Sequence, residues 1–426
     1  MKNLIIAAAL ASAGFAGSVL AQNIAITGGK IYTQTDQGVI KNGTVLIRDG
    51  NIESVNTGSA VPQGYRQYDA RGKVVTPGLV GAMTSLGLVE VESWAGLVDA
   101  SVGDASVSHS GAALDVSYAI NPDSTVIDVS RIEGVTSAAT TISYTDYLFQ
   151  GQGSVISLNE SAEIIRPRAF TVLDVSGDGA EQSGGSRAAL WVTLERLFDE
   201  AAALSEVPGL NSVWEGLNTR ADLEALQRIL SGEMPLIMEA DRKSDILQIL
   251  AFKSRHPEID IVLMDAAEAW RVADQLAEAD IPVIMNPEMN LPDSFEAIGA
   301  SIENAARLAQ AGVRIAVGME THNIRLATQH AGNAVANGLS HEQGIASLTS
   351  HPASILGVSD RVGSLAAGKQ ADVVIWSGDP LEVTEYAEQV FIQGQPIDME
   401  SRQTQLRNRY QNFYEQEKNT SQYIQP

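Results

Sequence analysis

Apolar and polar residues alternate with a period of two through residues 23–75. Turn-forming pairs interrupt the alternation at Gly28-Gly29, Asn42-Gly43 and Asp49-Gly50. Alternation broken by such turns is typical of β-hairpins. A small antiparallel sheet is therefore predicted for residues 22–75.

The pattern returns near the other end of the chain, in residues 361–400. An apolar run covers residues 373–376, and a second strand-like run covers residues 390–392. A short sheet cannot bury both of its faces alone. The two ends of the chain are therefore expected to meet in one β-sandwich beside the central region.

Strand-like and helix-like patterns alternate in the central region, residues 76–360. Strands are predicted at residues 137–142, 170–175, 236–240, 261–264, 283–285 and 313–317, with helices at 188–203, 223–230, 245–252 and 267–279. Continuously apolar strands that alternate with helices favour a parallel sheet covered by helices. The length of the region favours a (β/α)₈ TIM-like barrel. A doubly wound dinucleotide-binding sheet has no support, because no G-x-G-x-x-G follows a strand.

The two extremities carry different signals. Residues 1–21 contain Lys2, a short apolar run and the ending Val19-Leu20-Ala21. This pattern predicts a secretory signal peptide cleaved after Ala21, and hence a periplasmic protein without a membrane anchor. In residues 401–426, Leu406, Tyr410, Phe413 and Tyr414 recur at helical spacing, with arginines between them. A C-terminal helix folded back onto the body, followed by a disordered tail, is expected there.

Composition limits the classes of partner. The formal net charge is −24, with 52 acidic and 28 basic residues. Nucleic acid and anionic membranes would repel such a chain. The sequence contains no cysteine, so a disulfide, a lipid-anchored cleavage site and a thiol nucleophile are all excluded. No G-x-S-x-G, H-E-x-x-H or P-loop motif is present.

Three segments carry a resemblance to a known family: TPGLVGAM at residue 76 onward, GVRIAVGMETHNIRLATQHAGNAVANGLSHEQGIASLTSHPASILGV, and DRVGSLAAGKQADVVIWSGDPLE. Together they resemble the amidohydrolase superfamily, in particular its imidazolonepropionase-like bacterial periplasmic members. The resemblance implies a barrel flanked by a β-sandwich. It also implies hydrolysis at a metal ion, which lowers the pKa of its bound water from 15.7 to about 7.

The residues that hold this metal in the family are replaced here. The His-x-His pair of strand one corresponds to Met83 and Ser85. Glu239 and Asp265 stand where histidines are expected on strands five and six, and Glu320 lies near the catalytic aspartate of strand eight. A thioether and a neutral hydroxyl are poor ligands for a hard or borderline divalent cation.

Two interpretations of the remaining carboxylates stay open. If Glu239, Asp265 and Glu320 converge, they form an all-oxygen site suited to Mg, Mn or Ca rather than Zn, with Glu320 as the catalytic residue. Otherwise they line a wet, acidic crevice with no cofactor. His322, Asn323 and Arg325 follow strand eight directly, so they are candidates for holding a polar or anionic ligand at the barrel mouth.

The sequence therefore predicts an exported amidohydrolase-fold protein that is non-catalytic or weakly catalytic. Its partner would be a small molecule at the barrel mouth or an active relative, and an oligomer is allowed. The alternative is a hydrolase of C–N bonds in cyclic amides or dipeptide-like substrates, with a carboxylate-bound metal. The sequence does not identify the ligand.

Overall fold

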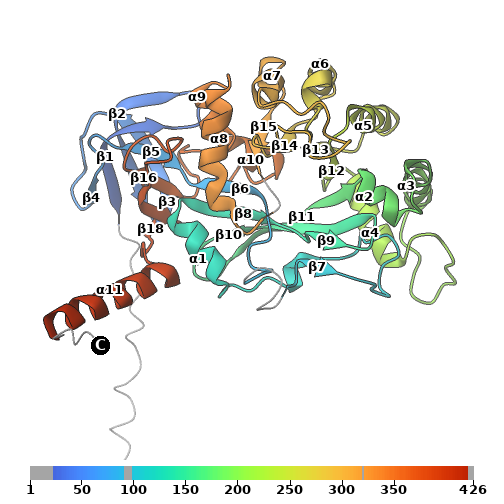
Figure 1. Cartoon of the computed structure of the whole chain (residues 1–426), viewed down its shortest axis with the longest axis horizontal. Coiled ribbons are helices and arrows are strands. Elements are labelled where there is room, and N and C mark those ends of the chain that lie inside the picture. Colours follow the sequence, from blue (N-terminus) through green and yellow to red (C-terminus); the bar gives the residue numbers. More distant parts are fainter. Residues whose placement is uncertain (1–22, 91–97, 319–320, 421–426) are drawn as a thin grey trace, which may run out of the picture.

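Both ends of the chain contribute to one sheet in the computed structural model, which describes residues 23–90, 98–318 and 321–420. The strand order is β18-β17-β16-β5-β1-β2-β3, and β4 pairs with β1 (Figure 1). The strands are β1 (Ile24–Tyr32), β2 (Val39–Arg48), β3 (Asn51–Thr57), β4 (Arg66–Asp69), β5 (Val74–Pro77), β16 (Val373–Trp376), β17 (Ala387–Ile392) and β18 (Gln395–Pro396).

The junction between the two chain ends is the antiparallel pair β5–β16. Trp376 Nε1 donates a hydrogen bond to Thr76 Oγ1 at 2.9 Å, and both side chains are buried. The prediction that the termini share a sheet is confirmed by this pairing. That the sheet forms a two-layered sandwich stays a prediction, as do the proposed domain limits.

The central region forms a second eight-stranded sheet, in the order β15-β14-β13-β12-β11-β10-β8-β6. Its strands are β6 (Leu79–Thr84), β8 (Val135–Thr140), β10 (Phe149–Ser157), β11 (Ile164–Asp174), β12 (Leu236–Ala240), β13 (Ile261–Asp265), β14 (Val283–Met285) and β15 (Ile315–Val317). A bridge between Thr84 and Thr321 brings the two edges together. The sheet is thus a nearly closed barrel, consistent with the predicted TIM-like fold.

One strand departs from the expected all-parallel pattern. β10 runs antiparallel to both β8 and β11. Only residues 141–148 and 158–163 connect these strands, whereas a parallel crossover needs a dozen or more residues. The strict (β/α)₈ prediction is therefore wrong at this position, because the connections are too short for helices.

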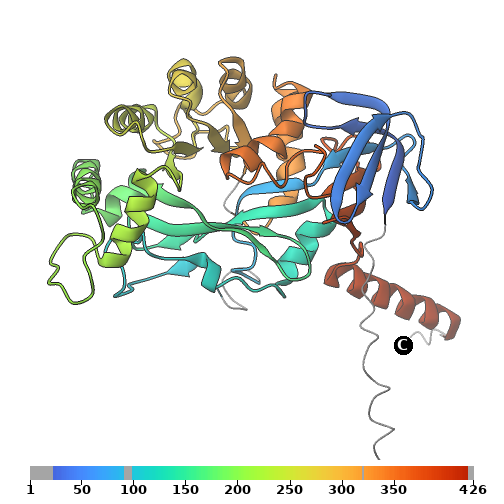
Figure 2. The same ribbon diagram turned by 180° about the vertical axis from the view of Figure 1, so that it is seen from behind.

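Helices cover the outside of β11 to β15 (Figure 2). The helices are η1 (Val116–Tyr118), α1 (Thr125–Ile132), α2 (Gly177–Gln182), α3 (Arg187–Ala202), α4 (Arg220–Leu230), α5 (Lys243–Arg255), η2 (Ala269–Val272), α6 (Ala273–Glu278), α7 (Asn304–Gln310), η3 (Ile324–Leu326), α8 (Ala327–Ala336), α9 (His341–Ala346), α10 (Ser350–Ile355) and α11 (Arg402–Thr420); β7 (Ser101–Val102) and β9 (Tyr144–Thr145) form a separate pair. In the described part of the chain, no helix is long and apolar enough to cross a membrane.

The barrel interior is an apolar core built from alternate residues of the strands. Met83, Phe170, Ile237 and Ile284 belong to it, and Ala353 of α10 packs against it. A larger apolar cluster lies between the strands and the covering helices. Burial of these side chains is the main stabilisation of the barrel.

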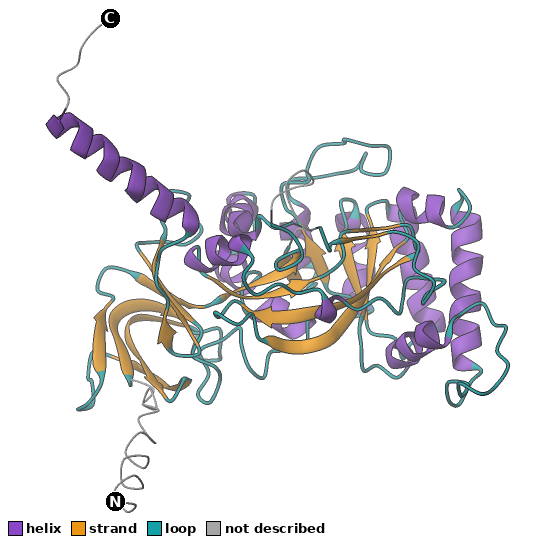
Figure 3. Cartoon of the chain, turned by 90° about the horizontal axis from the view of Figure 1, so that it is seen from below, coloured by secondary structure: helices purple, strands orange, loops and turns teal. Residues whose placement is uncertain are grey.

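Helix α11 departs from the expectation that the C-terminal helix folds back onto the body. It projects away from the rest of the molecule and is in contact with α1 (Figure 3). The side chains of Leu406, Tyr410 and Phe413 are 40%, 60% and 56% exposed. The predicted helix is present, but the predicted packing against the body is wrong.

Candidate functional site

Carboxylates gather at the C-terminal ends of three neighbouring strands. Asp174 ends β11, Asp265 ends β13, and Glu239 and Asp241 flank the last residue of β12. The register places Asp174 opposite Glu239, and Ala240 opposite Asp265. The carboxyl ends of barrel strands are where active sites of such folds lie. These four residues are called the mouth carboxylates below.

Glu239 and Asp265 form the centre of this set. A hydrogen bond between them lowers the pKa of Asp265, but burial raises it by more. Gln150, at the start of β10, donates a hydrogen bond from Nε2 to Glu239 Oε2 at 3.3 Å. The other amide atom, Oε1, is buried without a hydrogen-bond partner. Glu239 and Asp265 therefore lie in a polar environment enclosed by protein.

Burial also changes the acidity of the flanking carboxylates. Burial, followed by the charge of Asp265, raises the pKa of Asp241 to about 6. Burial likewise raises the pKa of Asp174, whose Oδ1 accepts a hydrogen bond from the Ser176 backbone at 2.7 Å. A carboxyl that titrates near neutrality can both give and take a proton.

The backbone at the end of β13 adopts an unusual conformation. Asp265 and Ala266 have φ angles of +65° and +62°. Two consecutive non-glycine residues in the left-handed region store strain, which is commonest at functional sites. The Ala267 amide beyond this turn donates to Asp241 Oδ1 at 2.9 Å. The turn therefore helps to fix Asp241.

Strand one carries Met83 and Ser85, the two residues at which the resemblance implies histidine ligands in the family. Met83 is fully buried and belongs to the apolar barrel interior, while Ser85 is 4% exposed. Among the residues that the structure describes, no three His, Cys, Asp or Glu side chains are placed to hold one metal ion.

The predicted residues of strand eight are only partly placed. Glu320 lies outside the described residues, so its predicted catalytic and metal-binding roles stay predictions. His322 and Asn323 are half-buried and Arg325 is exposed. The backbone here reaches strand one, because Ser85 N donates to Thr321 O at 3.3 Å. His322 thus directly follows a residue that contacts strand one.

A long loop, residues 286–303 between β14 and α7, passes along the mouth. Its Glu296 accepts hydrogen bonds from Gly177 N at 3.1 Å and from Arg187 Nη2 at 2.5 Å. Both donors follow β11, while β12 and β13 lie between β11 and β14. Asp293 and Glu296 also contribute to the raised pKa of Asp241. The β14–α7 loop therefore borders the mouth carboxylates.

Sequence reasoning missed three parts of this site. Asp174 lay inside a predicted strand, residues 170–175. Its position near the end of that strand was the signal that could have identified it as a site residue. Gln150 belongs to β10, which was not predicted as a strand because its sequence contains two closely spaced glycines. The β14–α7 loop carries no motif, and only its length between two predicted elements could have drawn attention to it.

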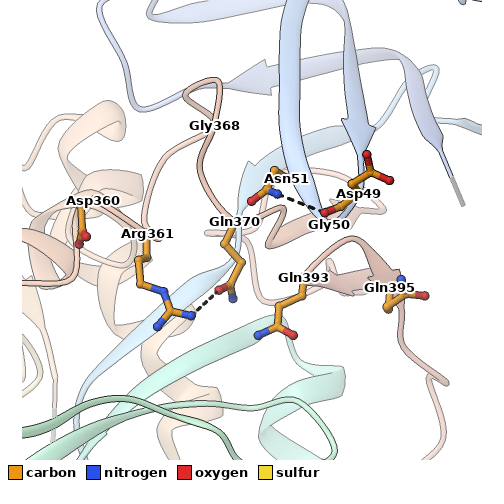
Figure 4. Close-up of a pocket in the computed structure, with 9 residues that line it drawn as sticks. All are labelled: Asp49, Gly50, Asn51, Asp360, Arg361, Gly368, Gln370, Gln393 and Gln395. Atoms are coloured by element: carbon orange, nitrogen blue, oxygen red, sulfur yellow. Dashed lines mark hydrogen bonds between the residues drawn. The ribbon is translucent and has the colours of Figure 1, made fainter. Parts of the chain in front are cut away.

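A separate open pocket of about 470 Å³ lies between the terminal sheet and the segment after α10 (Figure 4). It is lined by Asp49, Gly50, Asn51, Asp360, Arg361, Gly368, Gln370, Gln393 and Gln395. Arg361 Nη2 donates to Gln370 Oε1 at 3.3 Å and forms an ion pair with Glu163. None of the lining residues is a mouth carboxylate, and Arg361, Gln370 and Gln393 are already engaged with other side chains.

Comparison with known proteins places these features in context. A model of the amidohydrolase family matches residues 157–400. Amidohydrolase tasK of Hapsidospora irregularis is 25% identical over 395 residues, which are 83% of this chain and 39% of that protein. The chain thus spans about 39% of the length of the curated relative it matches.

Solved structures show the same fold. An amidohydrolase from Thermotoga maritima MSB8 is 25% identical with a TM-score of 0.77, covering 88% of this chain and 99% of that chain. A Xaa-Pro dipeptidase with bound methionine in its active site is 15% identical with a TM-score of 0.54, covering 88% of this chain and 100% of that chain.

Proposed function

Because this chain belongs to the amidohydrolase family, we propose that it binds a small molecule at the barrel mouth and has at most weak hydrolytic activity. The observation that carries the proposal is the burial of Met83 in the apolar barrel interior, at a position where the family places a metal ligand. Without ligands from strand one, a metal-bound water cannot be held in the usual way.

The mouth carboxylates favour a ligand with a cationic amine. Four acids lie on three adjacent strand ends, and Arg187 of the bordering elements is already paired with Asp245 and Glu296. Burial, followed by repulsion from Asp265, raises the pKa of Asp241, and a positively charged ligand would offset that repulsion. An anionic ligand at His322, Asn323 and Arg325 is the weaker expectation, because Arg325 is exposed.

The place of action proposed for the protein is the periplasm, on the strength of the N-terminal 21 residues. The DRVGSLAAGKQADVVIWSGDPLE segment supports membership of the imidazolonepropionase-like subgroup. Mass spectrometry of the protein purified from a periplasmic extract should find Gln22 at its N-terminus.

Calorimetric titration tests the ligand class. The mature protein is titrated with small primary amines, with neutral amides of the same size, and with carboxylates. Amines should bind, and Asp265→Asn should weaken this binding, whereas exposed Asp280→Asn should not. Binding of neutral or anionic compounds alone would overturn the proposed ligand class.

The second candidate is hydrolysis of a C–N bond, in a cyclic amide or dipeptide-like substrate. Family membership supports it, and so does Asp241, whose pKa of about 6 suits an acid–base residue at neutral pH. In this alternative Glu239, Asp265 and Glu320 would hold Mg, Mn or Ca. The ion would compete with a cationic amine for the same carboxylates.

Metal analysis and turnover assays separate the two candidates. The protein is purified without chelator, analysed for bound metals, and incubated with a panel of cyclic amides and dipeptides. Turnover that falls with Asp241→Asn but not with Asp280→Asn would replace the binding proposal by the enzymatic one. A stoichiometric ion lost in Glu239→Gln would have the same effect.

A further inference from the structure

Helix α11 presents an apolar stripe that its own chain leaves uncovered. Leu406, Tyr410 and Phe413 follow the spacing of one helix face, and all three are at least 40% exposed. An isolated helix in water gains little from its own hydrogen bonds, and most helices are stabilised by packing. A helix that projects from the body with this stripe (Figures 1 and 3) therefore needs a partner surface.

The charge of α11 identifies the kind of partner. The first part of the helix, residues 402–413, contains Arg402, Arg407 and Arg409 and no acidic residue, whereas its last part contains Glu415, Glu417 and Lys418. None of these arginines has an ion pair in the described part of the chain. The remaining residues carry 52 acids against 25 basic side chains. A second copy of this acidic chain would therefore complement the basic first part of α11.

The β14–α7 loop offers a matching surface. It exposes five apolar side chains: Met289, Leu291, Phe295, Ile298 and Ile302 are 47%, 74%, 90%, 61% and 44% exposed. Residues 286–303 include four acids and no basic residue. Glu288, Glu296 and Glu303 lie against His330, Arg187 and Arg307 of the same chain, so the charge of Asp293 is the one not balanced by an ion pair among the described residues. Exposed apolar groups rimmed by charge of one sign mark an interaction site for a partner of opposite sign.

We propose that α11 of one copy docks onto the β14–α7 loop of a second copy of this chain. Docking within one copy is excluded by the arrangement of the elements. Helix α11 starts beside α1 and β18, whereas the loop joins β14 to α7 on the other side of the barrel (Figure 1). The occupant of each loop must therefore come from another molecule.

Two copies related by a two-fold axis would exchange their helices. Each helix would then contribute Leu406, Tyr410 and Phe413 to one contact, and the symmetric contact would double the buried area. A stable dimer buries about 1,200–2,000 Å² in total. The exchanged helix would also border the mouth carboxylates of the partner, since the loop does so.

A membrane surface is the less favoured occupant. Only four of the nineteen residues of α11 are apolar or aromatic, which is few for an interfacial anchor. The strongly acidic body would in addition be repelled by anionic lipid. Vesicle binding is therefore an outcome that contradicts the proposal.

Cysteine cross-linking tests the contact directly, because the protein contains no cysteine. Single variants Tyr410→Cys and Phe295→Cys are mixed and oxidised. A disulfide-linked heterodimer is expected. Tyr410→Cys mixed with Val383→Cys is the matched control, since Val383 is 75% exposed and lies outside the loop. Equal cross-linking in both mixtures would contradict the proposal.

Sedimentation of the mature protein gives a second readout. The dimer should dissociate at least about tenfold more readily when Leu406, Tyr410 and Phe413 are replaced by serine, because three buried apolar side chains are lost. Replacing Gln405, Asn408 and Gln411 by serine on the polar side should change little. A monomer at all concentrations, or binding to anionic phosphatidylglycerol vesicles that the apolar residues control, would overturn the proposal.

Discussion

Arg187, at the start of α3, donates a hydrogen bond to Glu296 of the β14–α7 loop at 2.5 Å and a second one to Asp245 at 3.0 Å. One guanidinium thus ties the loop after β14 to the elements that follow β11 and β12. Both partners of the Arg187–Glu296 pair are about one-quarter exposed, at 23% and 27%. The loop is therefore held beside the mouth carboxylates by a partly buried ion pair.

Replacing Glu296 by alanine should release this loop. The Arg187–Glu296 bond and the hydrogen bond from the Gly177 amide are both lost, at a cost of about 1–3 kcal/mol. Hydrogen exchange in residues 286–303 should accelerate. Glu303→Ala, which breaks the exposed pair with Arg307, serves as control and should change the exchange little. Unchanged exchange in Glu296→Ala would show that the ion pair does not hold the loop.

The pH dependence of stability should contain a contribution from Asp241. Its pKa is raised from 3.8 to about 6 in the folded protein, so the folded state binds more protons than the unfolded state between these values. Stability from this group is full below about pH 4 and is lost as the pH rises through 6. At pH 8 the charged carboxylate then costs about 2 kcal/mol.

Asp241→Asn removes this cost while its amide oxygen can still accept from Ala267. The variant should be more stable than the parent at pH 8 by about 1–2 kcal/mol, and nearly equal at pH 4, by urea denaturation. The exposed Asp280→Asn should show no such difference between the two pH values. Equal effects of Asp241→Asn at both pH values would refute the raised pKa.

The positions of several parallel strands could be predicted because each contains an apolar run, as in residues 236–238 and 283–285. β10 could not, because its sequence FQGQGSVIS reads as a turn. Gly153 looks conformationally free in the sequence. In the fold it lies opposite Phe170, which is 17 positions away and fixes it. Only the fold shows that pairing.

The candidate site, like the fold, was predictable only in part. Glu239 and Asp265 were placed correctly at strand ends, because the parallel strands themselves were recognised. Two neighbouring groups were not predicted, because they come from elements distant in sequence: Gln150, which donates a hydrogen bond to Glu239, and Glu296, which contributes to the raised pKa of Asp241. The exposed face of α11 was missed for a related reason. Helical periodicity identifies an apolar face but does not say which molecule covers it.

Met83 should behave as a core residue rather than as part of a binding site. Met83→Ala should lower the free energy of unfolding by about 2–5 kcal/mol, because the side chain is fully buried in the barrel interior. Met83→Leu keeps the volume and should cost less than about 1.5 kcal/mol. Calorimetric titration with the amine ligand should give similar affinities for parent and Met83→Leu. A large loss of affinity in Met83→Leu would place the thioether in the binding site.

Gly153 should tolerate no side chain, for a reason internal to the barrel. A Cβ at this position would lie 2.2 Å from the ring of Phe170, which is itself fully buried and cannot move aside. Gly153→Ala should therefore destabilise the protein by about 1–3 kcal/mol or more through overpacking. Gly209→Ala is the matched control, since a Cβ there would meet nothing within 4 Å and its φ is not positive.

A double-mutant cycle tests whether Phe170 causes the loss. Phe170→Leu should lower the stability by itself, but it should reduce the destabilisation caused by Gly153→Ala, because the smaller side chain leaves room for the methyl group. Additive losses measured by urea denaturation would mean that the strain lies in the β10 backbone instead of in the contact with Phe170.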